Sequence, residues 1–383
     1  MLRNSDHSSI AGLRSVPYAE GMQLRFFCQE QISPSLSLAT DQFLLQSVAE
    51  TQMAVLRVYT YSDDCGDLVL FGRYHGLGQL SDQIQGQSHI QVARRFSGGR
   101  VVPSGDGFVH FSLILPHRSA LFSDDPYHLA PFQVLNRYVR GLLHGLKSAG
   151  LDAFYPGRDF LTVQQQPIAW ISFTTEDNGA LLCEGGLAVQ RDLSLLPYLL
   201  DRIDPNGTVS SQFFTPDQVT SVERITGKAP TLAQLARSIR NGFAQQPQLA
   251  NLDCLDEALS QTEQEQITQL ATCPPAANWL HSWPYRNDLP FHATTTTPLG
   301  VLEMRFSVTP EQTLGELQLS GDFIASPAAI TMLHHSLRGC PLEYTAVWEV
   351  VEQTFLQPQH YVLGLRHLRI IPETILKGYA EKS

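Results

Sequence analysis

Apolar and polar residues alternate with a period of two in some stretches of the chain and recur at helical spacing in others. The period of two predicts strands over 22–28, 55–61, 67–71, 108–115, 159–163, 168–173 and 180–189, the last interrupted at residues 183–186. Helical spacing predicts helices over 36–48, 127–148, 193–200 and 231–245. Ser33 and Thr231 are suitable caps, and Gly150 ends the second helix.

The last hundred residues repeat this alternation on a smaller scale. We expect a strand pair at 299–308 and 315–320, a turn at Gly321-Asp322, and helices over 327–337 and 346–354. The Gln-rich stretch 245–280 reads as a helical connection before them. The expected organisation is therefore a loosely ordered leader (1–22), a first domain (23–250), a connection (251–282) and a second domain (283–383).

Strands interleaved with helices predict an α/β to α+β first domain, and the shorter second set predicts a small α+β module. A chain of 383 residues with 43% hydrophobic and 16% charged residues can form a core in each domain. No apolar run approaches the roughly 20 residues that span a bilayer, and no signal segment opens the sequence, so a cytoplasmic location is expected. The six cysteines lack metal-site or disulfide spacing.

The net charge of −11 argues against nucleic-acid binding and against a membrane-surface role, because both need a surplus of positive charge. Lysine is rare, and most of the 26 basic residues are arginines. The lysines are Lys147, Lys228, Lys377 and Lys382.

The most informative stretch is residues 94–103, which precedes the strand at 108–115. Gly98 and Gly99 indicate a tight turn that exposes bare backbone, and Arg94, Arg95 and Arg100 flank it. Guanidinium groups bind phosphate or carboxylate in a bidentate manner, so an anion is one expected occupant. The alternative is a β-hairpin whose arginines point into water.

This stretch resembles the R-R-x-S-G-G-G-A-V loop of the lipoate-protein ligase A family, in the biotin/lipoate protein ligase superfamily. Further partial matches follow in the family's order and extend from about residue 24 to residue 355. They are Ser37-Leu38-Ala39-Thr40-Asp41, Val69-Leu70-Phe71-Gly72-Arg73-Tyr74-His75, Gly157-Arg158-Asp159, Glu184-Gly185-Gly186-Leu187, Val219-Thr220-Ser221-Val222, and, for the accessory domain, 315–323 with Leu337-Arg338-Gly339-Cys340.

The resemblance implies a mixed sheet flanked by helices, followed by an accessory domain. It implies an enzyme that uses ATP with Mg²⁺ to convert lipoate or octanoate into an acyl-adenylate, and then transfers the acyl group to a lysine of a lipoyl-domain protein. It implies ligand contacts by Arg73, Ser97, Gly98, Gly99, Arg100, Val101, Val102, Gly157, Asp159 and Trp170. Arg94, Arg95 and Arg158 would stabilise charge, and Val101, Val102, Phe108 and Phe111 would line an acyl tunnel.

The chain departs from the family pattern at several of these positions. Arg100 replaces the third glycine of the loop, and Ser104-Gly105 replaces a His-Asp pair. The family's lysine falls on Pro167, with no other lysine between Lys147 and Lys228, and a family glycine falls on Trp170. Arg158 or Arg100 could supply the missing cation. Trp170 could fill part of the ligand pocket, stack on a base or pack as a core residue.

Three hypotheses follow. The chain is a lipoate- or octanoate-protein ligase, or it is a catalytically degenerate member that acts as a binding or regulatory protein. The third is a Cys183-dependent acyltransferase, although a buried structural thiol is the plainer interpretation of Cys183. His110 is expected to be a satisfied strand histidine, and His334-His335 to lie on solvated surface. The sequence does not determine the oligomeric state.

Overall fold

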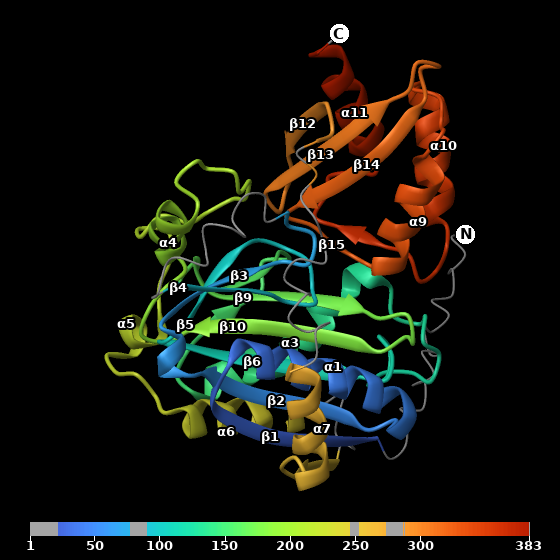
Figure 1. Cartoon of the computed structure of the whole chain (residues 1–383). Helices are drawn as coiled ribbons and strands as arrows, with labels where there is room; N and C mark the ends of the chain where they lie inside the picture. Colours follow the sequence, from blue (N-terminus) through green and yellow to red (C-terminus); the bar gives the residue numbers. More distant parts are fainter. Residues whose placement is uncertain (1–21, 77–89, 246–252, 273–285, 287, 383) are drawn as a thin grey trace, which may run out of the picture.

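A mixed eight-stranded sheet forms the centre of the first domain (Figure 1). The computed structural model describes residues 22–76, 90–245, 253–272, 286 and 288–382. The first three strands of the sheet are parallel, and the remaining pairs are antiparallel. In spatial order the strands are β11 (Asp253–Asp256), β1 (Gln23–Ile32), β2 (Ala54–Tyr61), β6 (Phe108–Leu115), β10 (Leu181–Ala188), β9 (Gln166–Thr175), β8 (Phe160–Val163) and β7 (Ala153–Phe154).

Two helices cover each face of this sheet. On one face, α1 (Pro34–Thr51) packs Leu44 and Val48 against β2 and β6, and α7 (Gln261–Thr272) packs on α1. On the other face lie α3 (Val134–Ser148) and α6 (Leu232–Ala244). The predicted caps form, since the side chains of Ser33 and Thr231 accept N–H groups of the first turns of α1 and α6.

A three-stranded sheet with the order β4 (Ile90–Arg94), β3 (Asp67–Phe71), β5 (Val102–Gly105) lies on the α1 side of the large sheet. The helix α4 (Leu195–Ile203) covers its outer side. The strands on either side of Gly98-Gly99 therefore do not pair with each other, and the hairpin alternative is wrong. Both pair with β3, so residues 95–101 cross the end of that strand.

The second domain is a sheet of β12 (Phe291–Thr296), β13 (Val301–Val308) and β14 (Leu314–Gly321), packed against α9 (Pro327–Leu337), α10 (Tyr344–Phe355) and α11 (Ile370–Ala380). The predicted strand pair and two helices are confirmed. β12 and α11 were not predicted. A short ribbon of β15 (Ile324–Ala325) and β16 (Val362–Leu363) faces the first domain. The predicted fold class, a mixed sheet flanked by helices with a small α+β domain behind it, is confirmed.

Three local predictions need correction. The helix predicted over 127–148 begins only at Val134, because residues 131–133 form a 3-10 turn. The strand at 180–189 is not interrupted, since Gly185 and Gly186 pair on both sides. The connection is not wholly helical, because β11 joins the large sheet beside β1. A short helix that was not predicted, α5 (Val222–Thr226), precedes α6.

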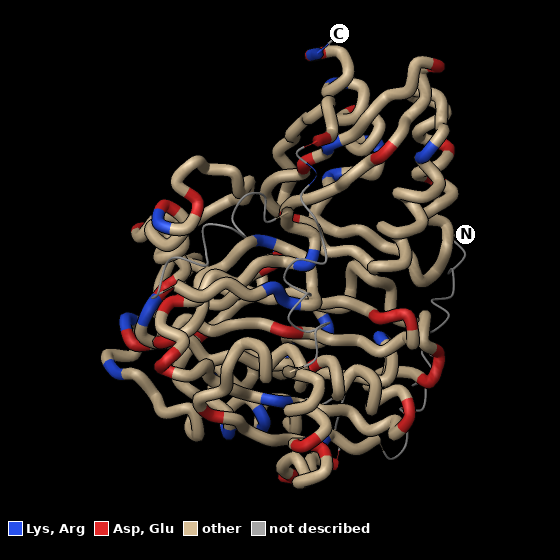
Figure 2. Tube along the Cα trace, in the orientation of Figure 1, with Lys and Arg blue, Asp and Glu red and all other residues tan. Residues whose placement is uncertain are grey.

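The remaining organisational predictions stand as follows. The leader up to residue 21, residues 246–252 and residues 273–285 lie outside the described part of the chain, and the domain boundaries stay predictions. None of the described helices is long and apolar enough to cross a membrane. Figure 2 shows basic and acidic positions interspersed over both domains, so neither sign of charge is confined to one side.

The buried Arg25 of β1 joins the sheet to the segment before α7. Its guanidinium donates to both carboxylate oxygens of Glu263, at 2.6 and 2.8 Å, and to the carbonyls of Glu257 and Ala258. These hydrogen bonds hold the pKa of Glu263 at about 2. The link fixes α7 to the edge of the sheet.

Arg25→Met should remove this link while keeping most of the packing. Because Glu263 and two carbonyls lose their donor, we expect a loss of about 2 kcal/mol in unfolding free energy, measured in urea. Hydrogen exchange should become faster in α7. Arg240→Ala, which breaks an exposed ion pair with Asp256, is the control and should cost less than about 1 kcal/mol. Unchanged exchange in α7 would contradict the assignment.

Candidate functional site

The loop of residues 95–101 is held from below by polar side chains of the large sheet. Ser97 N–H donates to Glu184 Oε1 at 2.9 Å, and Ser172 Oγ donates to the carbonyl of Gly98 at 2.9 Å. Glu184 and Ser172 are cross-strand partners on β10 and β9. Burial raises the pKa of the Glu184 carboxyl, and nearby Asp41 raises it further. The sheet thus fixes the orientation of the loop's peptide groups.

Arg95 holds the loop together from within. Its guanidinium donates to Ser97 Oγ and to the carbonyls of Leu70, Gly98 and Arg100, at distances between 2.7 and 3.3 Å. The guanidinium is buried and lies 4.8 Å over the ring of Trp170. Burial lowers its pKa to about 10. Arg95 therefore shapes the loop, and these donors are directed at backbone rather than at an open space.

Arg94 and Arg73 lie together beside the loop. Arg94 is 1% exposed and donates to the carbonyl of Arg73 at 2.7 Å. Burial, and after it the charge of Arg73, lowers the pKa of Arg94 to about 9. Arg73 pairs with Glu176 at 2.8 Å, and its N–H donates to the carbonyl of Ser97. Arg94 is thus a buried cation beside a half-buried, paired one, and a bound anion would stabilise the charge of Arg94.

Arg100 turns away from the loop toward Asp159. The distance from Arg100 Nε to Asp159 Oδ2 is 2.6 Å, and the guanidinium lies 5.1 Å from the ring centroid of Phe214 and 5.8 Å from that of Phe160. Asp159 Oδ1 is buried and has no hydrogen-bond partner among the described residues. Burial raises the pKa of Asp159, and Arg100 opposes that rise. Arg100 is thus a buried, paired cation.

Trp170 belongs to a row of cross-strand neighbours that runs Tyr59, His110, Gly186, Trp170. A Cβ on Gly186 would lie 2.4 Å from Trp170 Nε1 and 2.9 Å from His110 Cε1. The glycine therefore makes room for both rings. In the resemblance described from the sequence, Trp170 falls on a glycine and Gly186 on a threonine. Against that pattern the side chain is larger on β9 and smaller on β10.

The second domain covers the upper side of the loop. Gly99 N–H donates to the carbonyl of Phe323 at 2.8 Å, and a Cβ on Gly98 would lie 2.2 Å from that same oxygen. Glycine is required here because another backbone passes this close. Tyr74 continues the contact, since its hydroxyl donates to the carbonyl of Ala325 and its ring stacks on Phe323.

Asp322 is the residue of this interface that sequence reasoning missed. Its fully buried carboxylate lies 3.1 Å from His75 Nε2 and accepts from Ser211 Oγ and from the N–H groups of Gln212 and Val301. The only sequence signal was the turn Gly321-Asp322, which marks a bend but no partner. Asp322 joins the second domain to two separate loops of the first.

The expected acyl tunnel does not form from the residues named for it. Val101 packs with Phe71 under α4, whereas Val102 and Phe108 pack with Trp170. Phe111 points to the opposite face of the large sheet from Phe108. The two residues are an odd number of positions apart along β6, and successive side chains of a strand alternate between faces. The prediction that these side chains line one tunnel is wrong.

Several other candidates lie away from the loop. Gly157 and Arg158 are exposed, so Arg158 does not reach the site in this conformation. Pro167 lies at the start of β9, where its carbonyl accepts the N–H of Thr220.

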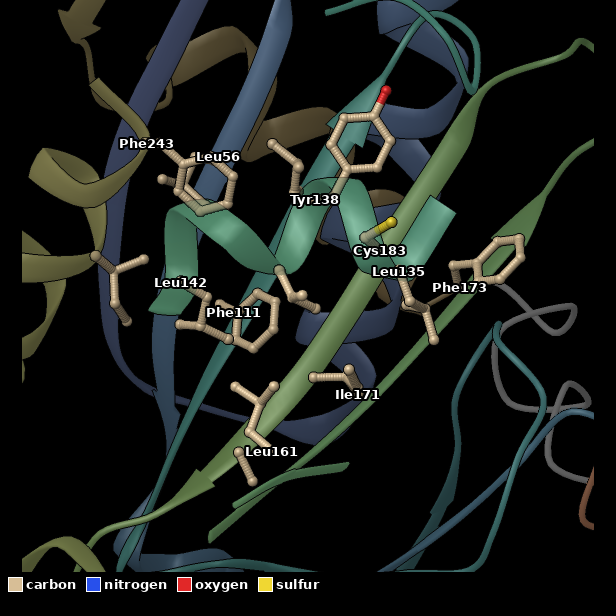
Figure 3. Close-up of a cluster of buried hydrophobic side chains, with 14 of the residues drawn as sticks. Leu56, Phe111, Leu135, Tyr138, Leu142, Leu161, Ile171, Phe173, Cys183 and Phe243 are labelled. Carbon is tan, nitrogen blue, oxygen red and sulfur yellow. The ribbon is translucent and has the colours of Figure 1, made fainter. Parts of the chain in front are cut away.

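Cys183 points away from the loop, into the core beneath α3. Figure 3 shows its sulfur among Leu135 and Tyr138. Burial raises the pKa of the thiol well above its ordinary value, and Glu184 adds to this. The thiol is therefore protonated and inaccessible, as a structural cysteine would be.

The histidines separate into two cases. His110 is buried, shares a hydrogen bond of 2.9 Å between its Nε2 and Ser104 Oγ, and has its pKa lowered to about 3 by burial. It fits the expected strand histidine, although Nδ1 has no partner among the described residues. The prediction that His334 lies on solvated surface is wrong. α9 packs this side chain against β14, and its Nε2 accepts the N–H of Leu319. His335 is exposed.

A family model described as the lipoyl protein ligase A/B catalytic domain matches residues 33–244. A search of curated proteins finds no match. Among solved structures, P. falciparum LipL1 in complex with lipoate is similar with a TM-score of 0.65 and 13% identity, covering 93% of this chain and 100% of that one. A lipoate-protein ligase A bound with ATP has a TM-score of 0.51 and 17% identity, covering 68% and 100%.

A bipartite lipoate-protein ligase of Thermoplasma acidophilum, solved in a study with its E2 lipoyl domain, has a TM-score of 0.50 and 17% identity. It covers 70% of this chain and 98% of the other. At these identities the likeness concerns the fold.

Gly186→Ala should destabilise the protein by about 1–3 kcal/mol, because its Cβ would overlap Trp170 Nε1. In a Trp170→Phe background the same substitution should cost less, since the indole nitrogen is absent. Urea unfolding of the two single variants and the double variant measures this coupling. Additive costs would show that the two positions do not share one space.

Because His110 is buried, we expect the stability of the folded protein to fall in acid. Its pKa is lower in the folded protein, so between about pH 3 and pH 6.5 the unfolded chain binds the extra proton and stability falls as the pH falls. At pH 4.5 this term is about 3 kcal/mol relative to pH 7. His110→Gln should lose less stability between pH 7 and pH 4.5 than the wild type in urea unfolding. Equal losses would rule out His110 as the source.

Proposed function

Because the chain belongs to the lipoyl protein ligase A/B catalytic-domain family, we propose that it activates a carboxylic acid of the lipoyl or octanoyl type with ATP. The acyl group is then transferred to a lysine of a lipoyl-domain protein. The solved structures with a similar fold support the three ligand classes, since they include a complex with lipoate, a complex with ATP and a ligase studied with its E2 lipoyl domain.

Two steps make up this reaction. In the first, a carboxylate oxygen of the acid bonds to the α-phosphorus of ATP, the bond to the β-phosphate oxygen breaks, and pyrophosphate leaves. In the second, a neutral lysine amine bonds to the acyl carbon, AMP leaves with the bonding electrons, and the nitrogen gives up a proton. Negative charge builds on the phosphoryl oxygens in the first step, so cations must face that position.

The observation that carries the proposal is the pair Arg73 and Arg94 beside the loop of residues 95–101. A phosphoryl group bound there would offset the burial and the repulsion by Arg73, which together lower the pKa of Arg94. Two N–H groups of the loop already donate within the protein, that of Ser97 to Glu184 Oε1 and that of Gly99 to the carbonyl of Phe323.

Access to Gly99 requires a change at the domain interface. Its N–H already donates to the carbonyl of Phe323, so a ligand oxygen can accept from it only after residues 322–324 have moved. Arg95 is not assigned a contact with the ligand, because its guanidinium donates to the carbonyls of the loop and maintains the loop's shape.

Mg²⁺ accompanies ATP in this family, but the residues here fit a protein-held ion poorly. Among the residues that the structure describes, no three His, Cys, Asp or Glu side chains gather as metal ligands. Asp159 lies beside Arg100 of the loop. It is paired with that guanidinium, whose charge would oppose the binding of a metal cation. No step is therefore assigned to a metal held by this chain.

A second candidate function is a binding or regulatory protein without ligase activity. It is favoured by the internal use of the cations, since Arg95 serves the loop's carbonyls and Arg100 serves Asp159. Pro167 at the position of the family's lysine favours it as well. This candidate and the ligase differ in whether the bound acid reacts with ATP.

Pyrophosphate exchange into ATP, with lipoate or octanoate present, tests the proposal. We expect exchange in the wild type and a loss of at least about 100-fold in Arg94→Ala, because a preorganised cation is removed. Cys183→Ser is the matched control and should keep the wild-type rate, since its thiol lies in the core. Absence of exchange in the wild type, with acid binding detected by calorimetry, would instead establish the second candidate.

A further inference from the structure

Glu184 connects the large sheet to the loop at Ser97. The side chain lies in β10 and is buried. Its Oε1 accepts the N–H of Ser97 at 2.9 Å, and its cross-strand neighbour Ser172 on β9 donates to the carbonyl of Gly98. Adjacent side chains on one face of the sheet therefore hold two peptide groups of the loop.

Arg73 contacts the other side of the peptide group that Glu184 holds. In a trans peptide the N–H and the C=O point in opposite directions, so the contact with Ser97 N–H directs the carbonyl of Phe96 away from the carboxyl group. Arg73 Nη1 donates to that carbonyl at 3.4 Å. The backbone N–H of Arg73 donates to the carbonyl of Ser97 at 2.8 Å. Both the main chain and the side chain of Arg73 are thus bound to the segment that Glu184 anchors.

Arg94 is connected to the same segment through Arg73. Its guanidinium donates to the carbonyl of Arg73 at 2.7 Å, so a displacement of that carbonyl changes where the guanidinium is held. The two cations that the proposed reaction uses therefore share one anchor in the sheet.

The buried side chains beside Glu184 form a polar row across the sheet. Its cross-strand neighbour on β6 is Ser112, which donates to Asp41 Oδ2 at 3.2 Å, and Asp41 pairs with the buried Arg57 at 2.7 Å. A carboxyl oxygen can accept a hydrogen bond whether or not the group is ionised. The contact with the loop therefore requires a side chain of this length that carries an acceptor oxygen, and it does not require the charge.

We propose that Glu184 is a positioning residue for the proposed ligase reaction, because through Ser97 it holds Arg73 and Arg94 beside the phosphoryl group. The inference rests on the proposed function and deepens it. Glu184 acts through the loop and not on the ligand. Misplacing preorganised cations by a fraction of an ångström to an ångström costs up to about 100-fold in rate, and the cost falls on kcat because the charge develops during the reaction.

The test is pyrophosphate exchange into ATP with octanoate, measured on the full-length wild type and on three variants. Glu184→Gln keeps the length and an acceptor oxygen, Glu184→Asp keeps the charge but is one carbon shorter, and Glu184→Ala keeps neither. We expect Glu184→Gln to stay within about threefold of the wild-type kcat, and Glu184→Asp and Glu184→Ala to lose at least about 10-fold in kcat, with the KM for octanoate changed by less than about threefold.

Glu303→Gln is the matched control. It alters a buried carboxylate of the second domain that pairs with Arg305, and it should keep the wild-type kcat. A loss in this control as large as that in Glu184→Asp would overturn the inference, since reduced stability would then explain both. Glu184→Gln and Glu184→Asp keep the test valid if Glu184→Ala does not fold.

Wild-type kcat in Glu184→Asp, or a loss in Glu184→Gln equal to that in Glu184→Asp, overturns the inference and leaves the ligase function intact. If the wild type shows no exchange, the ligase function fails, and ATP binding measured by calorimetry decides the inference alone. Weaker ATP binding by Glu184→Asp, with wild-type affinity in Glu184→Gln, supports it. Any other pattern of ATP binding, including none by the wild type, overturns it.

Discussion

The guanidinium of Arg95 donates to three backbone carbonyls and one hydroxyl, and the loop of residues 95–101 depends on these contacts. A cation with so many aligned acceptors tolerates burial, because each hydrogen bond offsets part of its lost hydration. The loop has no ladder pairing of its own, since it crosses the end of β3 and joins two strands that do not pair with each other. Arg95 binds its carbonyls from within, and Glu184 and Ser172 bind its peptide groups from the large sheet.

This constraint extends to both sides of the loop. Below it, Arg95 lies over Trp170, which needs the space left by Gly186, so the sheet and the loop form one packed unit. Above it, the carbonyl of Phe323 accepts from Gly99, and Asp322 binds two loops of the first domain. Through these contacts the second domain covers the loop. The geometry of the loop is therefore coupled to the position of that domain.

The buried charges bear on the proposed anion site in a chain with a net charge of −11. Surface charge is mixed in sign, but Arg94 lies inside the protein, where the lower dielectric strengthens its effect on a bound group. Arg100 is also buried but is neutralised by Asp159, and the half-buried Arg73 is paired with Glu176. Position and pairing, more than the number of arginines, decide which of them can act on a ligand.

Periodicity alone was sufficient for most of the strands and helices, for the caps at Ser33 and Thr231, and for the two-part α/β and α+β organisation. These features depend on residues that are close together in the sequence, so the sequence pattern is enough to predict them. The motif around Arg94 to Val102, together with the partial matches that follow it in the family's order, likewise identified the family.

The tertiary structure decided the remaining features, because those features depend on strand order and register. It placed Phe111 and Cys183 on the face opposite the loop, paired Arg100 with Asp159, brought Asp322 to His75, and set Trp170 against Gly186. No local pattern carries that information, since a strand's face and its neighbours are fixed only when distant segments pair.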